Sequence, residues 1–234
     1  MLESASEGKS VAMNAEAKPR RPHPYAHAAK LPLPETQEKV DVTALLLGDG
    51  EIEIEIGPGR GNFAFERAAF APANRLIGFE IRLKWAQIAD AKLGKLGHHH
   101  HARIFAEDAK AALARLEPAG SVARIFVHFP DPWWKKRHAK RLVVGDALLD
   151  SVVRLLRDGG EFFVQTDVDF RAEGYENVVE GYADLEPAGD AEGQPFLAAN
   201  PYGARSNREV RADEDGLPVT RMRWKRRPRL LAGE

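Results

Sequence analysis

The alternation of short apolar segments with longer helical segments, from about residue 50 onward, most constrains how this chain can fold. Strand-like segments cover 51–56, 75–80, 103–106, 123–129 and 161–166, and helical periodicity covers 62–70, 82–93, 109–116, 145–158 and 168–182. Strands that alternate with helices at this spacing build βαβ units. Because such crossovers are right-handed, we expect an α/β fold with a doubly wound, mostly parallel sheet in a single domain. A late strand is expected over 219–224.

The first strand is unusual because it alternates Glu and Ile. A central parallel strand is normally apolar on both faces. We therefore expect Glu51 and Glu53 to lie near the exposed start of this strand. Glu55 is then expected at its carboxyl end, where ligands bind in such sheets. We also expect Gly159-Gly160 to end the helix over 145–158.

Residues 1–40 mix small, polar and proline residues without a period, which predicts a flexible tail, disordered or extended, before a domain over 41–230. The basic, proline-rich stretch over 18–24 leaves open an arm that orders on an anionic polymer. Lys and Arg total 34 and Asp and Glu total 35, so a basic surface for nucleic acid must be local. The chain lacks cysteine, which suits a reducing cytoplasm, and no apolar run predicts a membrane span.

A glycine-rich loop follows the first strand, in Glu55-Ile56-Gly57-Pro58-Gly59-Arg60-Gly61. Glycines at such a turn let the backbone approach a ligand closely. The spacing G-x-G-x-G is one residue shorter than the dinucleotide fingerprint. The preceding Glu55 disfavours a pyrophosphate but suits a cationic ligand, such as the sulfonium and amino groups of S-adenosylmethionine.

Two more acids end the next two strands. Glu80 follows the second strand, where a carboxylate can accept both ribose hydroxyls. Asp108 follows the third strand, where it could accept from the adenine amino group, although it could equally cap the next helix. Three acids at successive strand ends beside one glycine loop resemble the Rossmann-like class I methyltransferase fold, with S-adenosylmethionine as the cofactor.

The fourth strand is followed by an acid, two tryptophans and a basic run, in Phe129-Pro130-Asp131-Pro132-Trp133-Trp134-Lys135-Lys136-Arg137-His138-Ala139-Lys140-Arg141-Leu142. This combination offers an acceptor for a base edge, stacking surfaces and phosphate contacts. The alternative is a solvated charge run with buried tryptophans, which the position beside the cofactor loop disfavours.

This segment resembles the hallmark F-P-D-P-W-P-K-K-R-H-x-K-R-R of the bacterial tRNA (guanine-N7-)-methyltransferases, which modify guanine 46 in the variable loop. Trp134 replaces a proline and Leu142 replaces the last arginine. The resemblance extends from about Glu51 to Arg227. It implies a cytoplasmic enzyme that transfers a methyl group from S-adenosylmethionine to guanine N7 of tRNA.

The resemblance also implies roles for individual residues. Asp131 is expected to be catalytic and to lie at the cofactor site. The remaining cofactor-binding residues are expected to be Glu55, Gly57, Gly59, Gly61, Glu80 and Asp108. Substrate binding is expected from the basic run, from Asp167 and from the late Ser206-Asn207-Arg208-Glu209 element, which stands where the family has T-x-x-E. The substrate-binding residues are therefore Lys135, Arg137, His138, Lys140, Arg141, Asp167, Ser206, Asn207, Arg208 and Glu209.

Guanine N7 has a free lone pair and no proton, so Asp131 is not needed as a base. We expect Asp131 and Asp167 to accept hydrogen bonds from guanine N–H groups and so to orient N7 for an in-line transfer. Three alternatives stay open: a methyltransferase of an exocyclic base amine, an NAD-dependent oxidoreductase, and a non-catalytic RNA-binding protein. The run His98–His101 is expected to be an exposed loop with incidental metal affinity, on the side of the sheet opposite the ligands.

Overall fold

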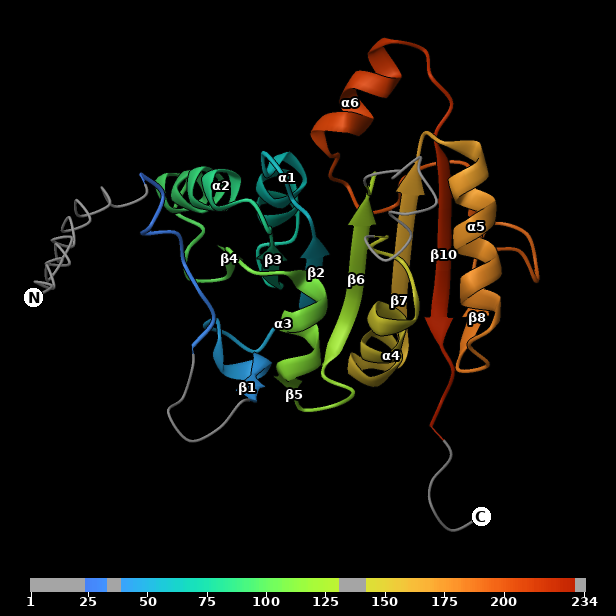
Figure 1. The fold of residues 1–234 in the computed structure, drawn as a ribbon, viewed down its shortest axis with the longest axis horizontal. Coiled ribbons are helices and arrows are strands. Elements are labelled where there is room, and N and C mark those ends of the chain that lie inside the picture. The colour runs from blue at the N-terminus through green and yellow to red at the C-terminus, as the bar shows by residue number, and fades with distance from the viewer. Residues whose placement is uncertain (1–23, 33–38, 131–141, 230–234) are drawn as a thin grey trace, which may run out of the picture.

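The computed structural model describes residues 24–32, 39–130 and 142–229, and it has the expected α/β architecture (Figure 1). Within these residues, eight strands form one sheet in the order β4-β3-β2-β6-β7-β10-β8, with β9 paired to β10. The first five of these are parallel, whereas β10 is antiparallel to β7. The strands are β2 (Ile52–Ile56), β3 (Arg75–Phe79), β4 (Ala102–Phe105), β6 (Val122–His128), β7 (Leu156–Thr166), β8 (Leu185–Pro187), β9 (Phe196–Leu197) and β10 (Thr220–Arg226).

Helices cover both faces of the sheet. The core on one face includes side chains of α3, α4 and α5, whereas α1 and α2 pack on the opposite face. A separate pair of short strands, β1 and β5, lies at the amino ends of the sheet strands beside a 3-10 helix, η1. The bounds are α1 (Asn62–Phe70), α2 (Leu83–Lys95), α3 (Ala109–Arg115), α4 (Asp146–Leu155), α5 (Asp169–Glu180), α6 (Asn207–Glu214), β1 (Val40–Asp41), η1 (Val42–Ala44) and β5 (Leu116–Glu117).

The expected helix end at Gly159-Gly160 is wrong. Helix α4 ends at Leu155, and β7 begins at the next residue. Both Leu155 and Leu156 are fully buried, so the chain passes from helix to strand without leaving the core. The glycines lie instead where the pairing of β6 with β7 shifts register. A Cβ at Gly160 would come within 2.8 Å of the Arg157 carbonyl oxygen, which explains why a glycine stands in this bulge.

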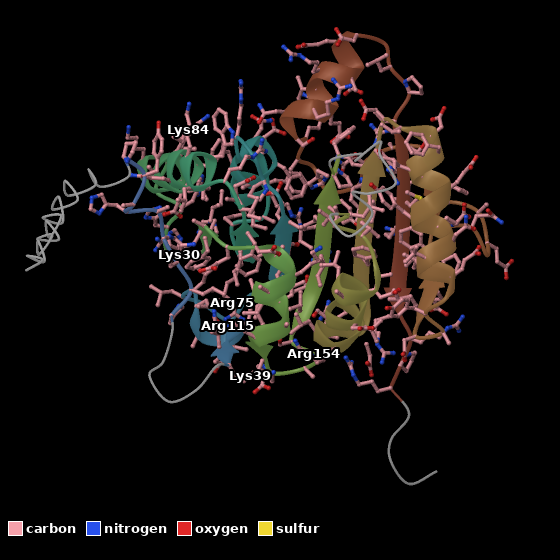
Figure 2. The ribbon with its side chains drawn as sticks, viewed as in Figure 1. Lys30, Lys39, Arg75, Lys84, Arg115 and Arg154 are labelled. Atoms are coloured by element: carbon pink, nitrogen blue, oxygen red, sulfur yellow. The ribbon has the colours of Figure 1, made fainter. Side chains whose placement is uncertain are left out.

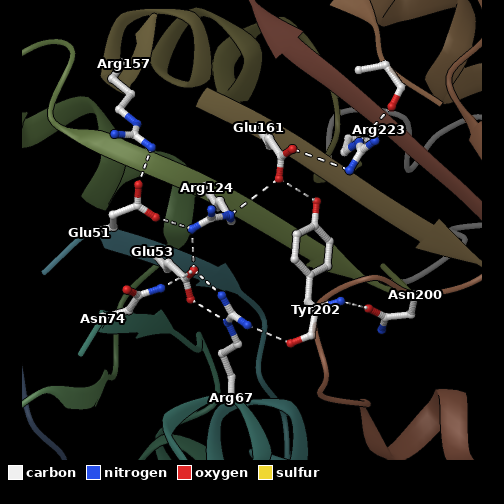
Figure 3. Close-up of polar contacts among 11 residues, drawn as sticks. Glu51, Glu53, Arg67, Asn74, Arg124, Arg157, Glu161, Asn200, Tyr202 and Arg223 are labelled. Atoms are coloured by element: carbon white, nitrogen blue, oxygen red, sulfur yellow. Dashed lines mark hydrogen bonds and ion pairs between the residues drawn. The ribbon is translucent and has the colours of Figure 1, made fainter. Parts of the chain in front are cut away.

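The alternating strand β2 separates two environments. Its three isoleucines pack in the core with α3, α4 and α5, while its glutamates lie on the face that α1 covers. Glu53 is completely buried, so the expectation of an exposed position is wrong for this residue. Its oxygens accept from Arg67 of α1 at 2.6 and 2.8 Å and from Arg124 of β6 at 2.9 Å (Figure 3).

The contacts of Glu53 with Arg67 and Arg124 are part of a polar network that extends across the sheet and links segments far apart in the sequence. Arg124 also contacts Glu161 of β7 at 3.4 Å. Tyr202 donates to Glu161 at 3.1 Å, and its carbonyl accepts from Arg67 at 2.7 Å. Figure 3 shows how these contacts join α1, β2, β6, β7 and the segment before α6. A buried carboxylate is tolerated here because Arg67, Asn74 and Arg124 all donate to it.

Part of the N-terminal segment lies against the domain. The amide of Ala106 donates to the Ala29 carbonyl at 2.7 Å, and Leu31 is almost fully buried. Several basic side chains on this side, shown in Figure 2, donate to backbone carbonyls, as Arg115 does to Pro32 at 3.0 Å and Arg154 to Leu116 at 2.7 Å. The division of the chain at residue 40 stays a prediction.

The run His98–His101 lies between α2 and β4, as expected, but His101 is buried rather than exposed. Its Nε2 lies 3.3 Å from the Ala68 carbonyl oxygen, and its Nδ1 lies 2.8 Å from Nε2 of His100. Among the described residues, no three His, Asp or Glu side chains are grouped so that they could hold a metal ion. None of the helices in the described ranges is long and apolar enough to cross a membrane.

We predict that Glu53→Gln lowers the free energy of unfolding by about 3–5 kcal/mol, because it leaves the buried Arg67 without its carboxylate. Urea denaturation measures this difference. Arg227→Ala serves as a control, since it breaks an exposed ion pair with Glu186 and should cost less than about 1 kcal/mol. Equal small losses in the two variants would contradict a structural role for the buried network.

Candidate active site

The candidate site lies at the carboxyl ends of β2 and β6, where the strand order reverses. From β2 the chain winds outward to β3 and β4, and it returns beside β2 as β6. Ligands of doubly wound sheets bind at such a switch point. Two adjoining cavities, of about 510 and 450 Å³, share Gly57, His128, Phe129 and Pro130 in their walls. The first, which we term the Glu80 cavity, also includes Glu80 and Asp108, and the second, the Glu55 cavity, includes Glu55 and Asp167.

The predicted glycine loop forms the wall between β2 and α1. All three glycines have positive φ, with values of 70° at Gly57, 56° at Gly59 and 82° at Gly61. Gly61 is also crowded, because a Cβ there would lie 2.8 Å from Ala89 Cβ and from the Phe65 ring. At Gly57 a Cβ would meet nothing within 4 Å, so the backbone there borders open space. The loop thus gives a ligand direct access to the backbone.

Glu55 is buried at the end of β2, and its Oε2 atom has no hydrogen-bond partner among the described residues. Burial, with a further contribution from the charge of Glu80, raises the pKa of Glu55 to about 8. An unpaired buried carboxyl group is costly unless it is protonated or meets a donor. The position therefore favours a ligand that brings a positive charge.

Glu80 and Asp108 lie together in the Glu80 cavity, as the sequence predicts. Glu80 is almost fully buried and accepts from the amides of Gly59 and Arg82, both at 2.9 Å. It therefore fixes the glycine loop relative to β3. Asp108 is the N-cap of α3 and accepts from the Lys110 amide at 2.9 Å. The capping role that the sequence left open is thus present, on a residue that also lines the cavity.

The described part of the F-P-D-P segment ends at Pro130. Phe129 has φ of 46°, in the left-handed region that a non-glycine residue occupies at a cost of about 1–3 kcal/mol. Its amide donates to the Gln165 carbonyl at 2.8 Å, which holds the bend against β7. Such strain concentrates at functional sites. The following predicted site residues lie outside the described residues: Asp131, Lys135, Arg137, His138, Lys140 and Arg141.

Helix α6 brings the late Ser206-Asn207-Arg208-Glu209 element to the Glu55 cavity. Ser206 caps the helix by accepting from the Glu209 amide at 3.2 Å. Arg208 Nε donates to Asp167 Oδ2 at 2.8 Å, so Arg208 fixes the carboxylate that follows β7. Ser206, Asn207, Arg208 and Asp167 all line this cavity together with Glu55.

Glu209 differs from its neighbours because it points into the protein and is 1% exposed. It accepts from Arg221 at 3.1 Å, from Asn200 at 3.0 Å and from Gln165 at 2.8 Å. This geometry anchors α6 on the sheet, and substrate binding by Glu209 stays a prediction.

The sequence did not point to His128, which lines both cavities, or to Gln165, which contacts it. His128 and Gln165 are the last or next-to-last residues of β6 and β7, and their side chains meet at 2.9 Å. Burial lowers the pKa of His128 to about 3, so the ring is neutral at pH 7. The available signal was a polar residue after the apolar run at the carboxyl end of each strand, where ligands bind in such sheets.

Comparison with known proteins agrees with this geometry. Residues 49–221 match a family described as putative methyltransferases. The tRNA (guanine-N(7)-)-methyltransferase of Myxococcus xanthus is 34% identical over 163 residues, which cover 70% of this chain and 77% of the relative. The enzyme of the same name from Synechococcus sp. (strain WH7803) is 36% identical over 175 residues, which cover 71% of each chain.

Solved structures show the same fold at low identity. The 16S rRNA methyltransferase KamB has a TM-score of 0.55 and 17% identity over 77% of this chain and 89% of its own. A putative methyltransferase from Streptococcus mutans in complex with SAH has a TM-score of 0.50 and 10% identity over 77% and 91% of the two chains. The fold and the switch-point site thus define a Rossmann-like methyltransferase. Within that class, the chain belongs to the tRNA (guanine-N(7)-)-methyltransferase family.

We predict that Glu55→Gln changes how stability depends on pH. The pKa of Glu55 is about 8 in the folded protein, against an ordinary value of 4.5, so the folded state binds more protons between these values. The wild type should therefore lose stability relative to Glu55→Gln as the pH rises from about 4.5 to about 8. Urea denaturation of both proteins across this range measures the difference. A difference that does not change with pH would contradict the burial of an unpaired carboxyl group.

Proposed function

We propose that this protein transfers a methyl group from S-adenosylmethionine to N7 of guanine in tRNA, at position 46 of the variable loop. Membership of the family supports the reaction. In this chain, the main support is that one cavity is lined by the glycine loop, Glu55, Phe129-Pro130 and the Ser206-Asn207-Arg208 part of the late element. A tRNA substrate also favours a cytoplasmic location.

The residues present fit this cofactor. In the Glu80 cavity, Glu80 and Asp108 would hold the ribose hydroxyls and the adenine amino group. In the adjoining Glu55 cavity, the unpaired carboxyl of Glu55 would hold the ammonium of the amino-acid end. The same carboxyl group disfavours a pyrophosphate. It therefore also disfavours the alternative of an NAD-dependent oxidoreductase, because NAD contains a pyrophosphate. When bound, the cofactor supplies an electrophilic methyl group on a sulfonium.

The protein's own contribution to the transfer is orientation. Guanine N7 needs no base, so a carboxylate near the ring serves as an acceptor for guanine N–H groups and favours the positive charge that the ring acquires. Asp167 suits this role because the Arg208 N–H groups both bind its Oδ2 atom, which fixes the carboxylate toward the Glu55 cavity. Asp131 would provide the second acceptor by its place in the F-P-D-P segment.

We predict that the purified protein forms 7-methylguanosine when bulk tRNA is incubated with methyl-labelled S-adenosylmethionine, as measured by nucleoside analysis. A transcript with adenine at position 46 serves as the matched control and should gain no label. Asp167→Asn should lower turnover about 10-fold or more, because an amide can present a donor to the guanine N–H groups. Label in a methylated exocyclic amine would overturn the proposed reaction, and label in the control transcript would overturn the proposed position.

A further inference from the structure

His128 is a buried residue, and only one of its two ring nitrogens has a hydrogen-bond partner among the described residues. It is 7% exposed, its Nδ1 atom meets Gln165, and its Nε2 atom has no hydrogen-bond partner among the described residues. The ring packs on Phe63 with centroids 4.2 Å apart and on Phe126 with centroids 5.9 Å apart. A buried N–H group without a partner costs about 1–3 kcal/mol. A ligand that accepts from this group would offset the cost.

The position of the proton on His128 follows from its neighbours. Glu209 accepts from Gln165 Nε2 at 2.8 Å, and a carboxylate can only accept. The amide nitrogen of Gln165 must therefore face Glu209, and the same nitrogen lies 2.9 Å from His128 Nδ1. Since that nitrogen donates, Nδ1 accepts, and the single proton of the neutral ring is on Nε2. Glu209 of α6 thus sets the tautomer of His128 at the end of β6.

A second polar atom that has no partner among the described residues, Glu55 Oε2, belongs to a neighbour of His128. Glu55 pairs with Phe126 in the register of β2 and β6, and Phe126 and His128 share one face of β6. Glu55 and His128 are therefore diagonal neighbours at the carboxyl edge, and both line the Glu55 cavity. A buried acceptor beside a buried donor matches a zwitterion, with an ammonium next to a carboxylate.

We propose that His128 Nε2–H binds the carboxylate at the amino-acid end of S-adenosylmethionine, while Glu55 binds its ammonium. Gln165 and Glu209 are positioning residues that hold His128 in the required tautomer. This inference rests on the proposed methyl transfer from that cofactor. It gives the late S-N-R-E element a role in cofactor binding through Glu209, which does not reach the Glu55 cavity itself.

The test compares two ligands by calorimetry: S-adenosylhomocysteine, and 5′-methylthioadenosine, which lacks the amino-acid end. His128→Asn and His128→Phe should weaken S-adenosylhomocysteine binding by about 10- to 100-fold and leave methylthioadenosine binding unchanged. His128→Gln should lose less, because its amide can reach the place of Nε2. Unchanged methylthioadenosine binding also shows that each variant is folded.

Two results would overturn this proposal while the proposed function stands. One is an equal loss for both ligands, which would make His128 a core residue only. The other is unchanged S-adenosylhomocysteine binding with impaired tRNA methylation, which would assign the donor to the guanine. By contrast, a wild-type protein that fails to bind S-adenosylhomocysteine would overturn the proposed function itself.

The positioning role has a separate readout in the tautomer of His128. Nitrogen NMR of ¹⁵N-histidine-labelled protein, with the His128→Asn spectrum for assignment, should show an Nε2–H ring. Glu209→Gln lets Gln165 turn its amide, so the proton should move to Nδ1 and S-adenosylhomocysteine binding should weaken as in His128→Asn. Glu214→Gln, at an exposed site on the same helix, is the control and should change neither. An Nδ1–H ring in the wild type would overturn the positioning role of Gln165 and Glu209.

Discussion

The structure depends on two buried carboxyl groups that lie two residues apart on one face of β2. Glu53 meets guanidinium groups of Arg67 and Arg124, and through them it joins α1 to the centre of the sheet. Within the described residues, Glu55 has no such partner at its Oε2 atom, and burial together with the charge of Glu80 raises its pKa. The fold satisfies the first acid internally and leaves the second at the switch point. The same strand thus carries one acid that is paired inside the fold and one that lines the cavity, where we propose that it binds the cofactor.

The contrast explains what the sequence could and could not predict. Strand–helix alternation predicted the parallel sheet, and a parallel sheet brings its carboxyl ends to one edge. Position alone therefore placed Glu55, Glu80 and Asp108 at that edge, where they line the two cavities. The burial of Glu53 was not predicted, because its partners come from α1 and β6 and no local pattern encodes them. The end of α4 was also misplaced, since glycines that usually stop a helix here form a bulge between β6 and β7.

The Ser206–Glu209 element also shows that local sequence does not encode contacts with distant segments. A resemblance identified Ser206-Asn207-Arg208-Glu209 as a functional unit, but the directions of its side chains depend on the packing of α6. Arg208 faces Asp167 and the Glu55 cavity, while Glu209 turns inward to Gln165. His128 and Gln165 could not be predicted from the sequence, because their roles depend on a contact between the ends of two neighbouring strands. Residues that line the cavity and a residue that is buried in the protein are thus adjacent in one short motif.

Because burial raises the pKa of Glu55 to about 8 and its Oε2 atom has no partner among the described residues, we expect this carboxyl group to stay protonated until a cationic ligand arrives. Calorimetry of S-adenosylhomocysteine binding at about pH 7, in buffers of different ionisation enthalpy, measures the protons exchanged on binding. Because the pKa of Glu55 is about 8 in the free protein, an incoming ammonium should release close to one proton. Glu55→Gln should release none. Equal proton release by the two proteins would contradict a protonated Glu55 in the free protein.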